Sequence, residues 1–184
     1  HPDPPAVAED WCFEHFDIQG RSEPGLFAAD LPICIDGSAL QPTWKDLSRA
    51  GCGASQITPS GELLRAVRSP LPGWLPQNSS NAEHASLVMA LQFSEHPRTA
   101  PLILDYSGLM KGLNPGRALH GHSNFAAYWR AVGNILQPPD WPQLRKVKAH
   151  RKLEEAVDEE DTYLILGNRA ADYHAGQAAL AHAV

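Results

Sequence analysis

Short apolar runs bounded by turn residues predict five strands in this chain. The first lies within 31–38, where the run 33–35 has no helical period and stands between Pro32 and Gly37, which is typical of a central strand. The turn 58–61 joins two further strands and indicates antiparallel pairing among the first three. The other predicted strands are 51–57, 62–69, 101–105 and 143–149.

Apolar residues at helical spacing, together with capping residues, predict helices between and after these strands. Residues 1–30 show no such spacing. They are rich in Pro and acids, so we expect an N-terminal arm whose aromatic side chains pack on the surface of a domain spanning 31–184. The predicted helices are 82–95, 107–113, 124–136, 151–161 and 168–182.

Composition and charge narrow the classes of function. A chain of 184 residues with 43% apolar content is long enough for one domain with an appendage. Its formal net charge of −6 provides no global basic field of the kind that attracts nucleic acid. No apolar run reaches the roughly 18 residues that a membrane helix needs, so we expect no membrane partner.

The cysteines indicate the compartment. The 3 cysteines are odd in number and form no C-x-x-C pair, which indicates neither a disulfide framework nor a zinc finger. We therefore expect an intracellular, reducing compartment, either cytoplasm or nucleus. The chain begins with His1 and not with Met, and we expect it to be part of a longer polypeptide.

Four carboxylates lie at the ends of predicted strands or in the first turns of predicted helices. Each has an ordinary explanation, as a turn residue or as a partner of a helix dipole. If they converge, they repel by about 4 kcal/mol per pair at ~4 Å and an effective dielectric of about 20, and bound cations would offset that repulsion. Oxygen ligands favour Mg²⁺ or Mn²⁺, and two such ions about 4 Å apart can promote attack on a phosphodiester. The four residues are Asp36, Glu83, Asp105 and Asp172.

Two other patterns have competing interpretations. The glycines of 51–53 lack the G-x-G-x-x-G spacing of a nucleotide-binding loop, so close packing of a strand is favoured. His120 and His122 could ligate a metal, but no third ligand lies in register, and we expect them in a solvated loop.

Five fragments, in order, resemble the motifs of type 1 ribonuclease H domains over about 32–181. The resemblance implies an α/β, ribonuclease H-like fold with a five-stranded mixed sheet, three antiparallel strands and then two parallel, flanked by helices. It also implies a metal-dependent endonuclease that hydrolyses the RNA strand of RNA–DNA hybrids and leaves 3′-hydroxyl and 5′-phosphate ends. The fragments are Ile-Asp-Gly-Ser at 35–38, Asn-Ser-Ser-Asn-Ala-Glu at 78–83, Leu-Asp-Tyr-Ser at 104–107, Val-Lys-Ala-His at 147–150 and Gly-Asn-Arg-Ala-Ala-Asp at 167–172.

Residue by residue, the resemblance assigns metal ligation to the four carboxylates, with two Mg²⁺ ions that Mn²⁺ can replace. It makes His150 a mobile residue that helps the product leave or relays a proton. Candidates for contact with the substrate are Ser38, Lys45, Ser80, Asn81, Lys148, Asn168 and Arg169.

The chain departs from cellular members of this family in several places. The connection 39–49 lacks their Gly- and Asn-rich pattern, the basic protrusion is reduced to 111–122, and the segment after His150 is longer and more acidic. Domains that lack the protrusion and carry an N-terminal arm are similar to those of retroelement reverse transcriptases. This similarity implies a covalently linked polymerase as a partner that holds the hybrid. Two alternatives stay open: another nuclease of the same fold, of resolvase or exonuclease type, and a non-catalytic connection or scaffold module of a reverse transcriptase.

Overall fold

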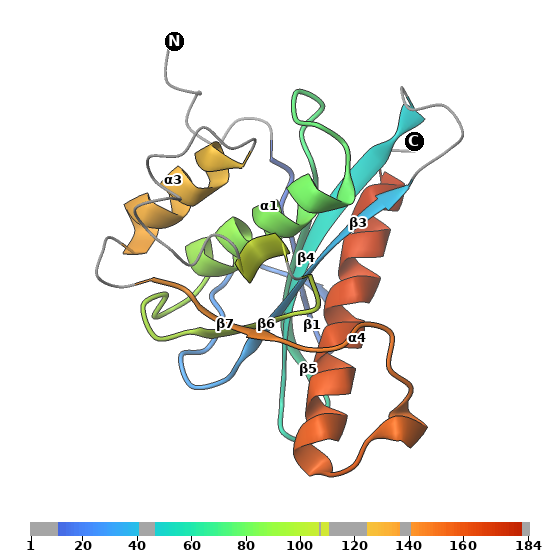
Figure 1. Cartoon of the computed structure of the whole chain (residues 1–184). Helices are drawn as coiled ribbons and strands as arrows, with labels where there is room; N and C mark the ends of the chain where they lie inside the picture. The colour runs from blue at the N-terminus through green and yellow to red at the C-terminus, as the bar shows by residue number, and fades with distance from the viewer. Residues whose placement is uncertain (1–10, 41–46, 107, 111–124, 137–140, 182–184) are drawn as a thin grey trace.

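The computed structural model describes residues 11–40, 47–106, 108–110, 125–136 and 141–181, which form one mixed sheet with helices on both faces (Figure 1). The strands lie in the order β2-β1-β5-β4-β3-β6-β7. None of the helices in these ranges is long and apolar enough to cross a membrane. The strands are β1 Glu14–Asp17, β2 Gly20–Ser22, β3 Ile33–Leu40, β4 Arg49–Ile57, β5 Leu63–Pro70, β6 Pro101–Leu104 and β7 Gln143–Lys146. The helices are α1 Ser79–Gln92, α3 Ala126–Leu136, the 3₁₀ helix η3 Leu153–Glu155 and α4 Glu159–Leu180.

The pairing of the strands follows the predicted topology. Strands β3, β4 and β5 pair antiparallel, and the register of β3 with β4 runs from Cys34 opposite Ser55 to Leu40 opposite Arg49. Strand β6 pairs parallel with β3, and β7 pairs parallel with β6. The α/β class and the arrangement of three antiparallel strands followed by two parallel ones are therefore confirmed.

The predicted count of five strands is wrong, because residues 11–30 supply two more. Strand β1 pairs antiparallel with β5, with His15 opposite Val67, and β2 pairs antiparallel with β1. These strands have only 4 and 3 residues, too few to show an alternating pattern in the sequence. Phe27 from the same segment is fully buried in the core, although its aromatics were expected on the domain surface.

The two faces of the sheet are covered by different helices (Figure 1). Helix α1 packs on β3 so closely that a Cβ on Gly37 would lie 2.4 Å from the backbone nitrogen of Glu83. Helix α4 packs on the opposite face, where a Cβ on Gly53 would lie 2.6 Å from the backbone nitrogen of Ala175. The interpretation of 51–53 as a closely packed strand is therefore confirmed.

Helix boundaries follow the capping residues. Helix α1 begins after Asn78, whose side chain accepts a hydrogen bond from the backbone of Asn81. Helix α4 begins after Asp158, which caps it in the same way, and three acidic residues in its first turn favour that start. The predicted start at 168 is wrong by nine residues, and the predicted helix 151–161 is instead η3 followed by the first turn of α4.

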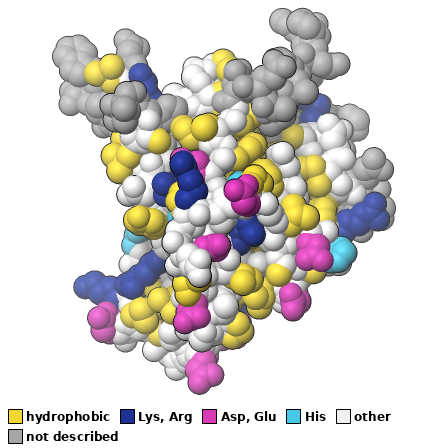
Figure 2. All heavy atoms as spheres, turned by 180° about the vertical axis from the view of Figure 1, so that it is seen from behind, with side chains coloured by type: hydrophobic (Ala, Val, Ile, Leu, Met, Phe, Trp, Pro, Cys, Tyr) yellow, Lys and Arg dark blue, Asp and Glu magenta, His cyan; other side chains and the backbone are white. Residues whose placement is uncertain are grey.

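Charged side chains are mixed on the face of the molecule seen in Figure 2. On the described part of that face, Lys and Arg side chains alternate with Asp and Glu and do not gather into one patch. This distribution agrees with the acidic net charge of −6. Any recognition of a polyanion must therefore depend on local groups rather than on a field of the whole domain.

Candidate functional site

The sequence predicted Asp36 at the end of a strand, but Asp36 lies within β3. The strand continues to Leu40, and Asp36 is paired with Gly53 of β4, which excludes a hairpin turn at Asp36 and Gly37. The side chain is 4% exposed, and its Oδ1 accepts a hydrogen bond of 2.9 Å from the backbone of Gly37. Strand β3, in the interior of the sheet, thus holds one carboxylate in a nearly water-free position.

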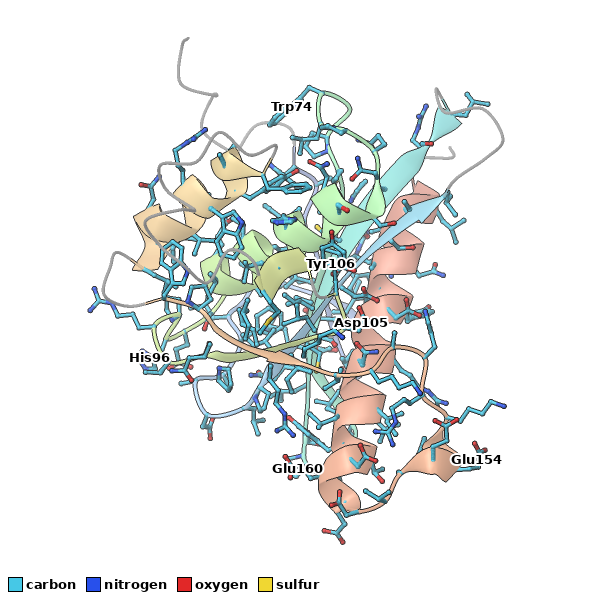
Figure 3. The ribbon with its side chains drawn as sticks, in the orientation of Figure 1. Trp74, His96, Asp105, Tyr106, Glu154 and Glu160 are labelled. Carbon is cyan, nitrogen blue, oxygen red and sulfur yellow. The ribbon has the colours of Figure 1, made fainter. Side chains whose placement is uncertain are left out.

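Two further carboxylates meet Asp36 from neighbouring elements. Glu83 projects from α1 and is 4% exposed, and its Oε2 is buried without a hydrogen-bond partner. Asp105 directly follows β6 and lies beside the middle of α4 in Figure 3. One oxygen atom from each of the three side chains lies within 4.8 Å of the others. We refer to Asp36, Glu83 and Asp105 as the acidic trio.

Burial and neighbouring charges raise the pKa values of Asp36 and Glu83. Burial is the largest cause of the raised pKa of Asp36, followed by the charges of Glu83 and Asp105. Burial also raises the pKa of Glu83, whose hydrogen bond with Asp36 acts in the opposite direction. The same contact with Glu83 raises the pKa of Asp36, so Asp36 is the member of this pair whose charged form is more disfavoured.

Asp172 approaches the trio from α4. It is solvent-exposed in the middle of that helix, and not in a first turn as predicted, because α4 begins at Glu159. A hydrogen bond with Asp172 contributes to the raised pKa of Asp36, so the two side chains are adjacent. The sequence-predicted carboxylates therefore come together, three of them as a tight cluster and Asp172 at its solvent side.

A cavity of about 280 Å³ adjoins Asp172, between α4 and the segment that follows β7. His150 lines it and is exposed, with a backbone φ of 55°. Asn168 connects the cavity to the trio, because its Nδ2 donates a hydrogen bond of 3.4 Å to Oδ2 of Asp105. The cavity also contains the predicted substrate-contact residues Lys148 and Arg169.

The other predicted contact residues lie at the start of α1, on β3, or outside the described ranges. The Ser80 hydroxyl is 2.9 Å from the hydroxyl of Tyr106. Asn81 is buried, donates to Asn78, and accepts a hydrogen bond of 2.9 Å from the Tyr128 hydroxyl. Ser38 lies on β3 and is partly buried. Lys45, His120 and His122 lie outside the described residues.

Tyr106 is a residue at the site that the sequence reasoning did not single out. It follows Asp105 directly, and Figure 3 shows these two residues close together. Its hydroxyl contacts the hydroxyl of Ser80. A Cβ on Gly108 would lie 2.3 Å from the Tyr106 ring, so Gly108 allows the chain to pass close over this ring. The adjacency of Tyr106 to an acid after a buried strand was the available signal.

No protein-family model and no curated protein matches the sequence. Solved structures do match. LC9-RNase H1, a type 1 RNase H with the type 2 active-site motif, is 16% identical over 86% of this chain and 74% of its own, with a TM-score of 0.57. The RNase H domain of PFV is 20% identical over 83% of this chain and 95% of its own, also with a TM-score of 0.57.

A third similar structure is much longer. The foamy viral protease-reverse transcriptase, solved in complex with an RNA/DNA hybrid, is 12% identical over 87% of this chain, with a TM-score of 0.56. This chain covers only 22% of that protein. The three similarities and the sheet order agree in one conclusion: the chain has the ribonuclease H-like fold.

Proposed function

We propose that this domain is a metal-dependent ribonuclease H that hydrolyses the RNA strand of RNA–DNA hybrids. The observation that carries the proposal is the acidic trio, which comes from strand β3, helix α1 and the end of β6. One oxygen atom from each of its side chains lies within 4.8 Å of the others. Asp36 and Glu83 are buried acids with raised pKa values, which destabilise the metal-free protein, and a functional ligand set is the usual reason for such an arrangement.

The residues present fit a hard divalent cation. All three side chains of the trio offer oxygen, which is the donor that Mg²⁺ and Mn²⁺ prefer. The buried Oε2 of Glu83 has no hydrogen-bond partner, so a cation would satisfy an atom that the fold leaves unsatisfied. Asp172, adjacent to Asp36, would complete the four ligands.

The roles of the residues follow from this placement. Two bound Mg²⁺ ions would lower the pKa of an attacking water and stabilise the charge on the leaving 3′-oxygen. The trio and Asp172 would hold the cations and orient the scissile phosphate, while Asn168 would hold the Asp105 carboxylate through its hydrogen bond. His150, which lines the adjoining cavity, would move a proton to or from the reacting phosphate and help the product leave.

The hybrid substrate and a linked polymerase belong to the same proposal. Lys148 and Arg169 line the cavity beside Asp172, and there they would contact backbone phosphates. The mixed surface charge and the net charge of −6 give weak unaided attraction to a polyanion. A polymerase in the same polypeptide, as in the foamy viral protease-reverse transcriptase, would supply the missing affinity.

The deciding experiment is cleavage of end-labelled substrates with and without Mg²⁺. We expect cleavage of the RNA strand of a hybrid, and none of duplex DNA or of a four-way junction of the same sequence. Asp105→Asn keeps the shape of the side chain and removes a ligand charge, so it should lower kcat by at least about 10³-fold, whereas Glu154→Gln, at an exposed position, should not. Cutting of a junction in preference to the hybrid would instead favour a resolvase.

A further inference from the structure

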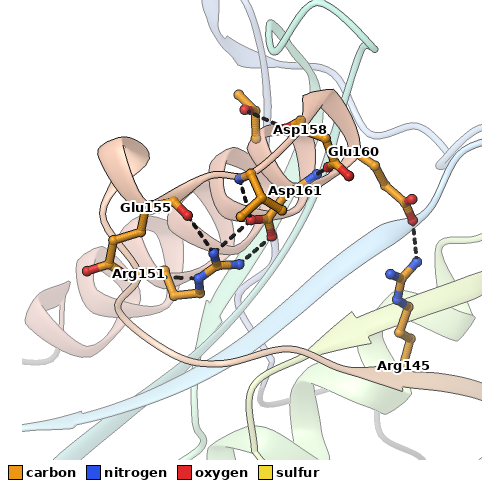
Figure 4. A network of polar contacts seen from close by, with 8 residues as sticks. Arg145, Arg151, Glu155, Asp158, Glu160 and Asp161 are labelled. Carbon is orange, nitrogen blue, oxygen red and sulfur yellow. Dashed lines mark hydrogen bonds and ion pairs between the residues drawn. The ribbon is translucent and has the colours of Figure 1, made fainter.

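Contacts of Arg151 hold the segment that follows His150 against the start of α4. Arg151 contacts both carboxylate oxygens of Asp161, through Nη1 and, at 2.7 Å, through Nη2. The same Nη2 donates to the backbone oxygen of Glu155 at 3.0 Å, and the backbone of Val157 donates to Asp161 at 3.1 Å (Figure 4). We call these four residues the Arg151–Asp161 clamp.

The clamp joins a sharp bend of the chain to the fixed start of α4. Asp161 lies in the first turn of that helix and donates its backbone N–H to the cap residue Asp158 at 2.8 Å. Arg151 is the residue next to His150, whose backbone has a left-handed φ of 55°. Residues other than glycine adopt this conformation uncommonly, although histidine does so more often than most. A strained backbone conformation persists only where neighbouring contacts hold it.

The ion pair between Arg145 and Glu160 is an exposed contact with which the clamp can be compared. Arg145 and Glu160 also join β7 to the first turn of α4, at 2.8 Å, but their side chains are 59% and 65% exposed. The side chains of Arg151 and Asp161 are only 23% and 15% exposed. The hydrogen bond from Arg151 also lowers the pKa of Asp161, which keeps the pair ionised.

We infer that Arg151 and Asp161 are positioning residues that hold the backbone of His150, and with it the imidazole, in the cavity beside Asp172. This inference rests on the proposed function, in which His150 assists the reaction. It differs from the expected mobile histidine, because a clamped residue acts from a fixed position. A group held in place avoids the loss of rate that follows a displacement of about 1 Å, which can reach about 10²-fold.

The first test breaks the clamp and measures turnover. We expect Asp161→Asn to lower kcat on the hybrid about tenfold with KM unchanged, since part of the 10²–10⁴-fold help from a general acid or base would be lost. Glu160→Gln, which breaks the exposed pair one residue away, should leave kcat unchanged. Arg151→Gln breaks the clamp without changing α4, and it should reproduce the effect of Asp161→Asn.

A double substitution separates positioning from a general loss of structure. In a His150→Ala background, Asp161→Asn should lower kcat no further, because the group that the clamp positions is already absent. Additive losses would overturn the inference. A fall in KM for Asp161→Asn would also overturn it, since that result would mean that the released Arg151 binds a phosphate instead.

A measurement that does not depend on activity completes the test. The backbone order parameter of His150, measured by nitrogen-15 relaxation on the metal-free chain, should be near 0.85 in the parent and below about 0.6 in Asp161→Asn. An unchanged order parameter would overturn the inference. If the order parameter falls but the parent chain cleaves no hybrid, the clamp holds His150 as inferred and the proposed function is wrong.

Discussion

Replacing Asp36 by Asn should stabilise the metal-free protein at neutral pH. Asp36 is 4% exposed, and burial together with the charges of Glu83 and Asp105 raises its pKa above the ordinary value of 3.8. The native state therefore keeps a proton that the unfolded chain releases. The stability contributed by this group is fully present below pH ~3.8 and is lost as the pH rises towards the raised native pKa.

The size of the effect follows from the span of pH. Each pH unit between the unfolded pKa of 3.8 and the working pH lowers the free energy of unfolding by about 1.4 kcal/mol. About three pH units therefore lower it by up to ~4 kcal/mol at pH 7. Asn has the shape of the protonated acid and does not titrate. We therefore expect Asp36→Asn to raise the free energy of unfolding by about 2–4 kcal/mol at pH 7 and by little at pH 4.

Urea denaturation in the presence of a chelator, at pH values from 4 to 8, measures this difference directly. Glu154→Gln, which removes an exposed acid, serves as the control and should follow the parent at every pH. Mg²⁺ should stabilise the parent by mass action and the Asp36→Asn variant much less. A parent and variant that stay equally stable from pH 4 to 8 would refute the close approach of the three carboxylates.

Two further predictions concern residues around the sheet. Gly37→Ala should destabilise the protein by about 3 kcal/mol, because the new Cβ would lie 2.4 Å from the backbone of Glu83, whereas Gly73→Ala, with nothing within 4 Å, should be neutral in thermal unfolding. His174 has a pKa lowered to about 4, chiefly by burial and next by Arg68, so its contribution to stability should be complete above pH 6.5 and be lost as the pH falls towards 4. His174→Gln should reduce that acid-induced loss, and denaturation curves with the same loss in parent and variant would contradict the assignment.

The sequence was most informative where a residue's neighbours along the chain determine its surroundings. The buried run before Asp36, the capping residues before Glu83 and the apolar run before Asp105 all placed their acids correctly near one sheet, because strands and helix starts are local features. The glycines of 51–53 were also interpreted correctly, since a strand that lacks side chains can pack closely against a helix.

Long-range contacts account for the errors. Strand β1 pairs with β5, about fifty residues away, and its four residues are too few to show a local signal. The run of acids at 158–161 predicts a solvated segment. In the structure, Asp158 caps helix α4 and Asp161 is the partner of Arg151. Such partnerships depend on where the chain folds back, and spacing in the sequence does not reveal them.

The pairing of β1 with β5 has a practical consequence for anyone who shortens the chain. A fragment that begins at residue 31 would lack β1 and would leave the stretch of β5 from Ala66 to Arg68 without the strand that pairs with it on that side. It would also open the space that Phe27 fills in the core. An exposed edge strand beside an apolar opening is a template for aggregation between molecules. A shortened chain should therefore keep residues 11–30 to avoid aggregation.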